Sequence, residues 1–163
     1  MELVCCLAMK DPQVYHHLLP LARHPLVSRL WIVRSHQSAY GTIPKAEYVL
    51  TPMPKPWRWL QMLRRCRALA ARPNVTAFLS FNPFPYGLIS MLAARRFSLP
   101  THFGFVGLDW HQHMQGPLRR MLMPTLGRAA FITVAGAGMR QDMIDRGLDA
   151  DRIAVLPHSI DPV

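Results

Sequence analysis

The sequence predicts one doubly wound α/β domain of the Rossmann-like type, in which helices cover a mostly parallel sheet. Three observations predict this fold class. Short apolar runs alternate with helix-like patterns along the chain, the connections between them are short, and 163 residues, half of them hydrophobic, are enough for one core. Parallel neighbouring strands need a crossover connection, and a helix is the usual one.

The first half of the chain contains four expected strands and three expected helices. Apolar runs too short for helices, bounded by proline, glycine, asparagine or charged residues, predict buried strands at 3–8, 30–33, 48–50 and 75–81. Helical spacing of apolar residues predicts helices at 12–23, 57–72 and 86–97. The proline-rich stretch 51–56 indicates an extended connector.

The second half repeats the alternation. It predicts strands at 101–106, 131–134 and 153–156, and helices at 117–126 and 138–146, the latter ended by Gly147 as its cap. Ligands of doubly wound sheets bind outside the carboxyl ends of the strands. We therefore expect binding residues in the loops after Ala8, Phe81 and Val106 and in the turn after Val134.

The charge of the chain is strongly positive and unevenly placed. The formal net charge is +10, carried mainly by arginine, and no acidic residue occurs between Glu47 and Asp109. This favours partners that carry phosphate and predicts one distinctly positive face. Nucleic-acid binding is not expected, because it has only the charge to support it and no basic and aromatic recognition motif.

Cysteines and apolar segments bear on the class of protein. Cys5 and Cys6 are adjacent and Cys66 is far away, so buried thiols are expected rather than a disulfide framework or a zinc site. Neither a metal nor a bound cofactor is expected.

No segment approaches the roughly 18 apolar residues of a membrane span, and Glu2 stands where a secretory signal carries positive charge. We therefore expect a cytoplasmic protein.

The last part of the chain contains a recognisable order of motifs. In residues 129–161, the expected strand 131–134 leads into a helix containing Met139 and Arg140, then Gly147, the strand 153–156 and an exit through 156–161. This order resembles the end of the N-terminal domain in family-4 glycosyltransferases of the GT-B fold. The segment 107–110 also resembles the acceptor-side loop of that family, so the resemblance covers about the last two-fifths of the chain.

The resemblance implies half of a GT-B enzyme. Residues 1–156 are expected to form the N-terminal domain and residues 157–163 to begin the interdomain linker. The implied reaction is transfer of a sugar with retained configuration, from a nucleotide sugar as co-substrate to a glycan or a lipid-linked acceptor. The expected partner is a donor-binding C-terminal domain or a separate subunit, and without it we expect this half to be inactive.

Several positions depart from the family pattern. Val106 stands where a histidine is frequent, His158 and Ser159 stand where asparagine and glycine are usual, and the loop 9–12 lacks glycines that let a backbone approach a diphosphate. These departures keep an alternative open. In that alternative the chain is a non-catalytic partner domain that recruits the enzyme to a membrane or regulates it.

The candidate site residues follow from the resemblance and from residue chemistry. We interpret Asp109 and His111 as catalytic groups that accept a hydrogen bond from the acceptor hydroxyl. The expected substrate-binding residues, with Trp110 as a platform for a sugar ring, are Asn82, Gly107, Trp110, His113 and Arg140. The structural alternative is that Asp109 caps a helix, the histidines are solvated, and the residues around Asn82 only shape a turn.

The expected helix 57–72 has two interpretations. Its apolar face fits a crossover helix packed on the sheet, with Arg58, Arg65 and Arg72 in a row along its flank. Alternatively Trp57, Trp59 and these arginines rest on an anionic membrane surface, and the protein is peripheral at the inner face of the cytoplasmic membrane. The two are compatible if the helix packs inward and exposes one edge.

Overall fold

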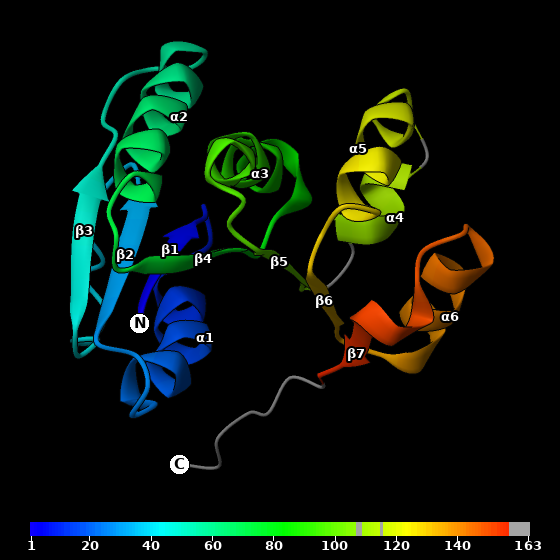
Figure 1. Ribbon diagram of the computed structural model, residues 1–163, viewed down its shortest axis with the longest axis horizontal. Helices are drawn as coiled ribbons and strands as arrows, with labels where there is room; N and C mark the ends of the chain where they lie inside the picture. Colours follow the sequence, from blue (N-terminus) through cyan, green and yellow to red (C-terminus); the bar gives the residue numbers. More distant parts are fainter. Residues whose placement is uncertain (107–108, 115, 157–163) are drawn as a thin grey trace.

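A single parallel sheet organises the chain. The computed structural model describes residues 1–106, 109–114 and 116–156, apart from the side chains of Asp109 and His113. The strands are β1 (Glu2–Cys6), β2 (Arg29–Arg34), β3 (Ala46–Leu50), β4 (Val75–Ser80), β5 (Thr101–Phe105), β6 (Phe131–Val134) and β7 (Ile153–Val155). Their spatial order is β3-β2-β1-β4-β5-β6-β7, and every pair is parallel (Figure 1). The predicted doubly wound α/β fold is confirmed.

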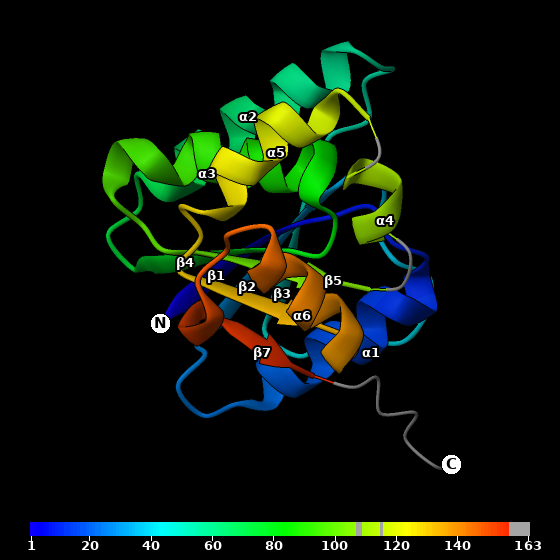
Figure 2. The same ribbon diagram turned by 90° about the vertical axis from the view of Figure 1, so that its right-hand side faces the viewer.

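Helices cover both faces of this sheet. The α-helices are α1 (Asp11–Arg23), α2 (Trp57–Ala70), α3 (Leu88–Ala94), α4 (Asp109–Met114), α5 (Leu118–Leu126) and α6 (Ala137–Asp145), and the short turns are η1 (Pro83–Gly87), η2 (Arg95–Phe97) and η3 (Ala150–Arg152). Helices α2, α3 and α5 lie on one face and α1 lies on the other (Figure 2).

The two faces have separate apolar cores, and the adjacent cysteines show the division. Cys5 belongs to the cluster that α1 closes with Val14 and Leu18, whereas Cys6 belongs to the cluster that α2 closes with Met62 and Cys66. Successive side chains of a strand point to opposite faces, so this is the expected arrangement. All three thiols are buried and unbridged, as the sequence predicts.

Two features depart from a strict alternation of strand and helix. Residues 35–45 connect β2 to β3 without a helix, and none was predicted there. This loop packs on α1 instead, where the rings of Tyr40 and Tyr15 meet edge to face at 5.5 Å and Ile43 joins the core. The second departure is α4, a short helix at the carboxyl end of β5 that the sequence pattern does not predict.

Gly147 ends α6 as predicted. It has a φ of +92°, which favours glycine because a Cβ strains this conformation. Its N–H donates to the carbonyl of Ile144 at 2.8 Å, and the N–H of Leu148 donates to the carbonyl of Met143 at 3.1 Å. The buried side chains of Leu148 and Met143 complete a Schellman motif, which turns the chain towards β7.

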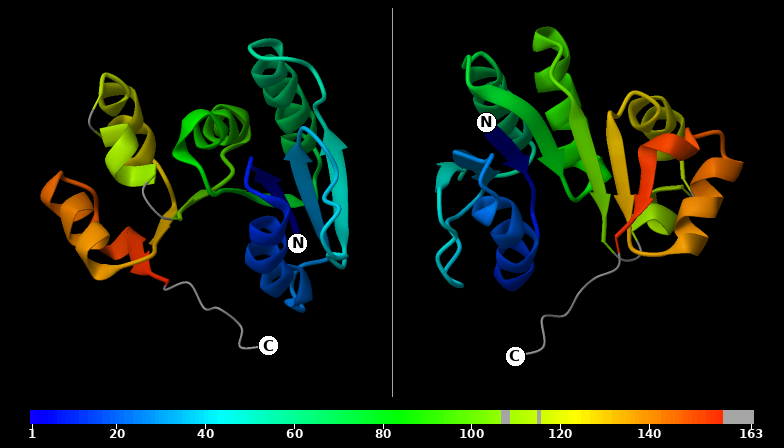
Figure 3. Two further views of the ribbon diagram at one scale, coloured as in Figure 1. Left: turned by 180° about the vertical axis from the view of Figure 1, so that it is seen from behind. Right: turned by 60° about the horizontal axis from the view of Figure 1, so that its bottom comes forward.

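The order of strands reverses at β1. After β1 the chain crosses to β2 over the face that holds α1, whereas β4 connects to β5 on the opposite side through α3 (Figure 3). The two connections therefore leave the carboxyl ends of β1 and β4 in opposite directions. A crevice forms at such a switch point, and it is where doubly wound folds bind ligands.

Candidate functional site

A hollow lies at this switch point. It has a volume of about 200 Å³ and is lined by Ala8, Met9, Lys10 and Gln13 after β1, by Phe81 and Asn82 after β4, and by Val106 after β5. Two of the four loops expected to bind a ligand, those after Ala8 and Phe81, are thus brought together with Val106, the last described residue before the third loop. The fourth, the turn after Val134, does not line the hollow. We call this feature the carboxyl-edge hollow.

The positive end of α1 faces into the lining of the carboxyl-edge hollow. Lys10 is the N-cap of α1, and its own N–H donates to Oε1 of Gln13 at 3.3 Å. No side chain caps the first turn of the helix in return. The ammonium group of Lys10 beside the helix N-terminus favours negative charge at this wall, and the Asp11 carboxylate in the same turn, which opposes it, is paired with Arg34.

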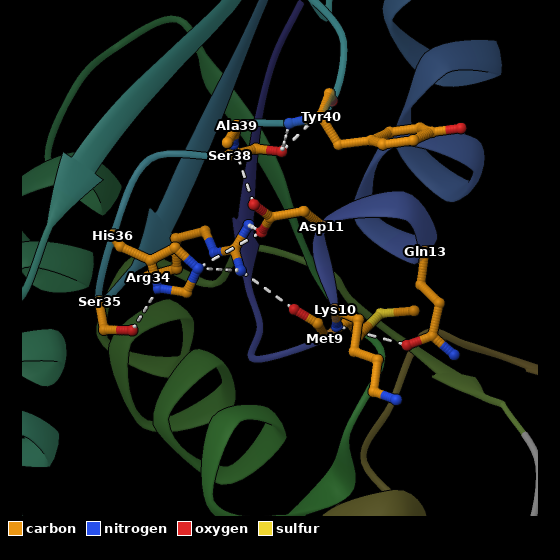
Figure 4. A network of polar contacts seen from close by, with 10 residues as sticks. All are labelled: Met9, Lys10, Asp11, Gln13, Arg34, Ser35, His36, Ser38, Ala39 and Tyr40. Carbon is orange, nitrogen blue, oxygen red and sulfur yellow. Dashed lines mark hydrogen bonds and ion pairs between the residues drawn. The ribbon is translucent and has the colours of Figure 1, made fainter.

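A network of polar contacts fixes the loop that carries Lys10 (Figure 4). Arg34, at the end of β2, is only 2% exposed, and its Nη1 lies 2.9 Å from Oδ1 of Asp11. Its Nη2 donates to the carbonyl of Met9 at 3.0 Å. Arg34 therefore holds the residues on both sides of Lys10, from a rigid strand beneath them.

Asp11 is held in turn from the neighbouring loop. The N–H of Ala39 donates to Oδ2 of Asp11 at 2.9 Å, and Nε2 of His36 lies 3.4 Å from Oδ1. The Ala39 hydrogen bond, and after it Arg34 and His36, lower the pKa of Asp11, although burial acts in the opposite direction. The carboxylate stays ionised and joins the loop 35–45 to the start of α1.

Sequence reasoning did not find this network. The two available signals are an acidic residue at the start of the first helix, Asp11, and an arginine that directly follows the apolar run 30–33, Arg34. An arginine at such a buried position needs an anionic partner. The partner lies at the start of α1, and the periodicity of a single sequence does not show which elements meet.

Aromatic residues form the next part of the hollow. The ring of His17, one turn after Gln13 on α1, stacks on Phe81 at 5.1 Å. Gly104 lies beneath Phe81, because a Cβ at Gly104 would be 2.6 Å from Cδ1 of that ring. His102 packs on the same ring at 6.3 Å, and burial lowers the pKa of His102 to about 4. Phe81 is therefore clamped between α1 and β5.

Trp110 has a different role from the predicted one. Its side chain is 0% exposed and lies edge to face with Phe105 at 5.7 Å. Its Nε1–H donates to Oδ2 of Asp142 on α6, and Arg146 lies over its ring. We correct the expectation of a sugar platform, because no face of the ring is open. Trp110 instead anchors α4 to α6.

The Trp110 anchor affects the charge of Asp142. The pKa of Asp142 is lowered first by the Trp110 hydrogen bond and then by Arg146, whose Nε lies 2.9 Å from Oδ1. Because these contacts fix α4, they also fix the backbone of the predicted catalytic residues Asp109 and His111 at the carboxyl end of β5. His111 is exposed and does not line the carboxyl-edge hollow.

The other predicted residues have different outcomes. Asn82 lines the carboxyl-edge hollow, in accord with its predicted position. Arg140 does not reach it: its Nε donates to the carbonyl of Ile153 at 2.9 Å and its Nη2 to that of Ala150 at 3.1 Å, so it ties α6 to the start of β7. We therefore correct its substrate-binding role to a structural one.

The remaining predicted positions lie outside the described residues. They are Gly107, the side chains of Asp109 and His113, and the expected linker 157–163.

Within residues 1–106, 109–114 and 116–156, no group of three histidine, cysteine, aspartate or glutamate side chains is arranged to hold a metal ion. Within those same ranges, no helix is both long and apolar enough to cross a bilayer.

Comparison with protein families gives one match. The model of the family described as "Glycosyl transferase 4-like domain" matches residues 13–158. No curated protein sequence matches the chain. The matched range includes four residues that line the carboxyl-edge hollow, Gln13, Phe81, Asn82 and Val106, and the segment around α4; Ala8, Met9 and Lys10 lie before it.

Solved structures with a similar fold are larger proteins. UDP-GlcNAc 2-epimerase from Methanocaldococcus jannaschii has 11% identity and a TM-score of 0.69, with 95% of this chain and 45% of that chain covered. The epimerase from Neisseria meningitidis bound to UDP-GlcNAc has 13% identity and a TM-score of 0.69, with 95% and 46% covered. HepE from Anabaena in complex with UDP has 14% identity and a TM-score of 0.71, with 99% and 45% covered. At these identities the similarity establishes the fold alone, and this chain spans less than half the length of those structures.

Proposed function

Because this chain belongs to the glycosyl transferase 4-like family, we propose that it is the acceptor-binding half of a retaining glycosyltransferase. A second domain or subunit supplies the nucleotide sugar, and the acceptor is a glycan or a lipid-linked sugar. The observation that carries the proposal is the carboxyl-edge hollow, which lies at the switch point of the sheet. The length of the similar structures, about twice that of this chain, supports a second half.

Lys10 and the first turn of α1 supply the electrostatic part of this function. Sugar transfer from a nucleotide sugar releases a diphosphate, and negative charge develops on it in the transition state. Arg34 and Asp11 hold the backbone on both sides of Lys10, and the exposed ammonium group of Lys10, together with the positive end of the helix, would stabilise such charge. The second half would hold the donor so that its diphosphate faces this wall.

The acceptor is bound by residues after β4 and β5. Asn82 provides an amide side chain at the wall of the carboxyl-edge hollow, and Phe81 provides an apolar surface beside it. We propose that Asp109 and His111 accept the hydrogen bond of the reacting hydroxyl, with Gly107 and His113 completing the acceptor loop. Their place directly after β5 supports this assignment, because that strand ends at the hollow.

The test is transfer by the complete gene product, or by this chain with its separately encoded second half. The assay uses a panel of nucleotide sugars and acceptors, and NMR of the product gives its anomeric configuration. We expect turnover with one donor and retained configuration. Inverted configuration would contradict the retaining mechanism, and the absence of both turnover and acceptor binding across the panel would contradict the proposal.

A binding measurement separates the catalytic proposal from the non-catalytic alternative. A partner domain that only recruits or regulates would alter the activity of another enzyme without binding an acceptor itself. Isothermal titration of the acceptor into this chain distinguishes the two. Binding that Asn82→Ala weakens supports acceptor recognition, whereas undetectable binding combined with stimulation of a separate transferase supports the alternative.

A further inference from the structure

The outer side of α2 exposes apolar residues beside the sheet. The inner side of this helix is buried through Met62, Cys66 and Leu69. On the outer side, and in the connector before it, the exposed fractions are 43% for Met53, 60% for Trp57 and 45% for Leu60. The helix is therefore fixed to the sheet by one side and carries an unpartnered apolar group on the other.

Arginines continue this outer side towards the end of α2. Arg64, Arg65 and Arg67 are exposed, and in the part of the chain that the structure describes none of their side chains has a hydrogen bond or an ion pair. No acidic residue occurs from position 48 to position 108, where the sequence has eight lysines and arginines. We call Met53, Trp57, Leu60, Arg64, Arg65 and Arg67 the α2 surface.

The chemistry of the α2 surface favours an anionic bilayer over other partners. Tryptophan prefers the boundary between headgroups and acyl chains, and leucine and methionine next to it add apolar area that inserts below the headgroups. Unpaired arginines beside them are attracted to anionic headgroups. A nucleic acid would complement the arginines and stack on Trp57, but its binding does not rely on contacts with exposed aliphatic side chains such as Met53 and Leu60.

The position of the α2 surface relates it to the candidate site. Helix α2 follows β3, so its apolar first turn lies at the edge where the strands end, on the same side as the start of α1 (Figure 2). The ring of Trp59 in that turn meets Phe84 at 6.0 Å, and Phe84 lies two residues after Asn82. A bilayer in contact with Trp57 would therefore lie next to the loop of Asn82, which lines the carboxyl-edge hollow.

We propose that the α2 surface docks the domain on an anionic lipid bilayer, with Trp57 and Leu60 inserted at the headgroup boundary and the arginines on the headgroups. The domain docks as a rigid body, because the inner side of α2 stays in the core. The carboxyl-edge hollow then faces along the bilayer, where a lipid-linked acceptor would be presented. The docking does not depend on catalysis, so it goes beyond the proposed function and can fail independently of it.

Trp57 provides a direct readout. Trp31 and Trp110 are buried and Trp59 is half-buried, so Trp57 is the exposed indole among the four tryptophans. The test mixes the chain with vesicles of phosphatidylglycerol and phosphatidylcholine, and with vesicles of phosphatidylcholine alone. We expect co-sedimentation with the anionic vesicles, a blue shift of the tryptophan emission, and quenching by lipids brominated on the acyl chain. Trp57→Phe should remove the shift.

Variants separate the charged from the apolar contribution. Arg64→Glu/Arg67→Glu should weaken binding to anionic vesicles by more than about tenfold, because each basic residue at such a surface contributes about fivefold. Trp57→Ala/Leu60→Ser should weaken it by a similar factor. The matched control is Arg23→Glu/Arg128→Glu, which makes the same change of charge at exposed positions away from α2 and should bind nearly as the wild type does.

Three outcomes would overturn the proposal. The first is equal binding by the α2 charge variant and its control, which would mean that net charge alone drives adsorption. The second is binding to a single-stranded RNA that matches vesicle binding and is unchanged by Trp57→Ala/Leu60→Ser, since the surface would then recognise polyanions. The third is self-association without lipid, measured by sedimentation velocity, that Trp57→Ala abolishes.

Discussion

The guanidinium of Arg34 and the carboxylate of Asp11 form an ion pair of 2.9 Å that joins the end of β2 to the start of α1. Arg34 is 2% exposed, so its charge depends on this partner and on the carbonyl of Met9. The pair lies directly beneath the loop of Lys10. It thereby connects the stability of the domain to the geometry of the candidate site.

Loss of the Asp11 carboxylate should destabilise the domain. Asp11→Asn leaves a buried guanidinium without an anion, and we expect the free energy of unfolding in urea to fall by about 2–3 kcal/mol. The matched control is Glu47→Gln, which removes the exposed Arg29–Glu47 pair of 3.1 Å and should cost less than about 1 kcal/mol. Equal losses in the two variants would show that the Arg34 pair is not effectively buried.

His102 should make the domain sensitive to mild acid. Burial lowers the pKa of His102 to about 4 from its ordinary value of 6.5, so the unfolded chain takes up this proton more readily than the folded one. The free energy of unfolding is unaffected by protonation of His102 above about pH 6.5. It decreases as the pH falls from the unfolded pKa of 6.5 to the folded pKa of about 4, by about 3 kcal/mol in total. Urea unfolding at a series of pH values measures it.

A neutral replacement isolates the His102 contribution. His102→Gln can keep the contact with Oγ1 of Thr133, which lies 3.0 Å from Nε2, but it has no proton to gain. Its free energy of unfolding should change less between pH 7 and pH 4 than that of the wild type. His16→Gln, at an exposed position on α1, should keep the slope of the wild type. An unchanged slope in His102→Gln would contradict the assignment.

Gly104 should tolerate no side chain. A Cβ there would lie 2.6 Å from Cδ1 of Phe81, so Gly104→Ala should displace the ring that lines the carboxyl-edge hollow and lower stability by about 1–3 kcal/mol. Gly138→Ala is the control, because that position in α6 has open space and alanine favours a helix by about 0.5–1 kcal/mol. Thermal unfolding of both variants should shift in opposite directions; a shift of the same sign and size would contradict the close approach.

The hydrogen bond between Trp110 and Asp142 should be visible in the titration of the carboxyl group. Trp110→Phe keeps an aromatic ring in the core but removes the N–H, so the pKa of Asp142 should rise towards its ordinary value. Because the folded pKa is lowered, this interaction stabilises the fold above the pKa of the unfolded chain and is lost as the pH falls through the folded one. Carboxyl ¹³C NMR follows Asp142, and an unchanged midpoint would contradict the bond.

Local patterns in the sequence were sufficient for most of the fold. The seven strands follow from short apolar runs, and the end of α6 follows from Gly147. The family resemblance inferred from residues 129–161 is confirmed by the match over residues 13–158. The short helix α4 was missed because six residues carry too little periodicity to distinguish a helix from a loop.

The candidate site was predictable as a place rather than as a set of residues. The rule that ligands bind at the carboxyl ends of strands located the loops after Ala8 and Phe81 and the position of Val106, all of which contribute residues to the carboxyl-edge hollow. The roles of Trp110 and Arg140 were wrong because residue type does not reveal burial or backbone partners. The contact between Arg34 and Asp11 joins the end of β2 to the start of α1, and local spacing carries no information about it.

The most direct measurement of the central claim is the effect of Lys10 on sugar transfer. With the complete gene product and its identified donor, Lys10→Gln should lower kcat/KM by at least about tenfold, because the diphosphate loses a cation in the transition state. The variant should unfold at the same urea concentration as the wild type, and Arg23→Gln on the far end of α1 should leave kcat/KM unchanged. Equal kcat/KM for Lys10→Gln and the wild type would contradict the account.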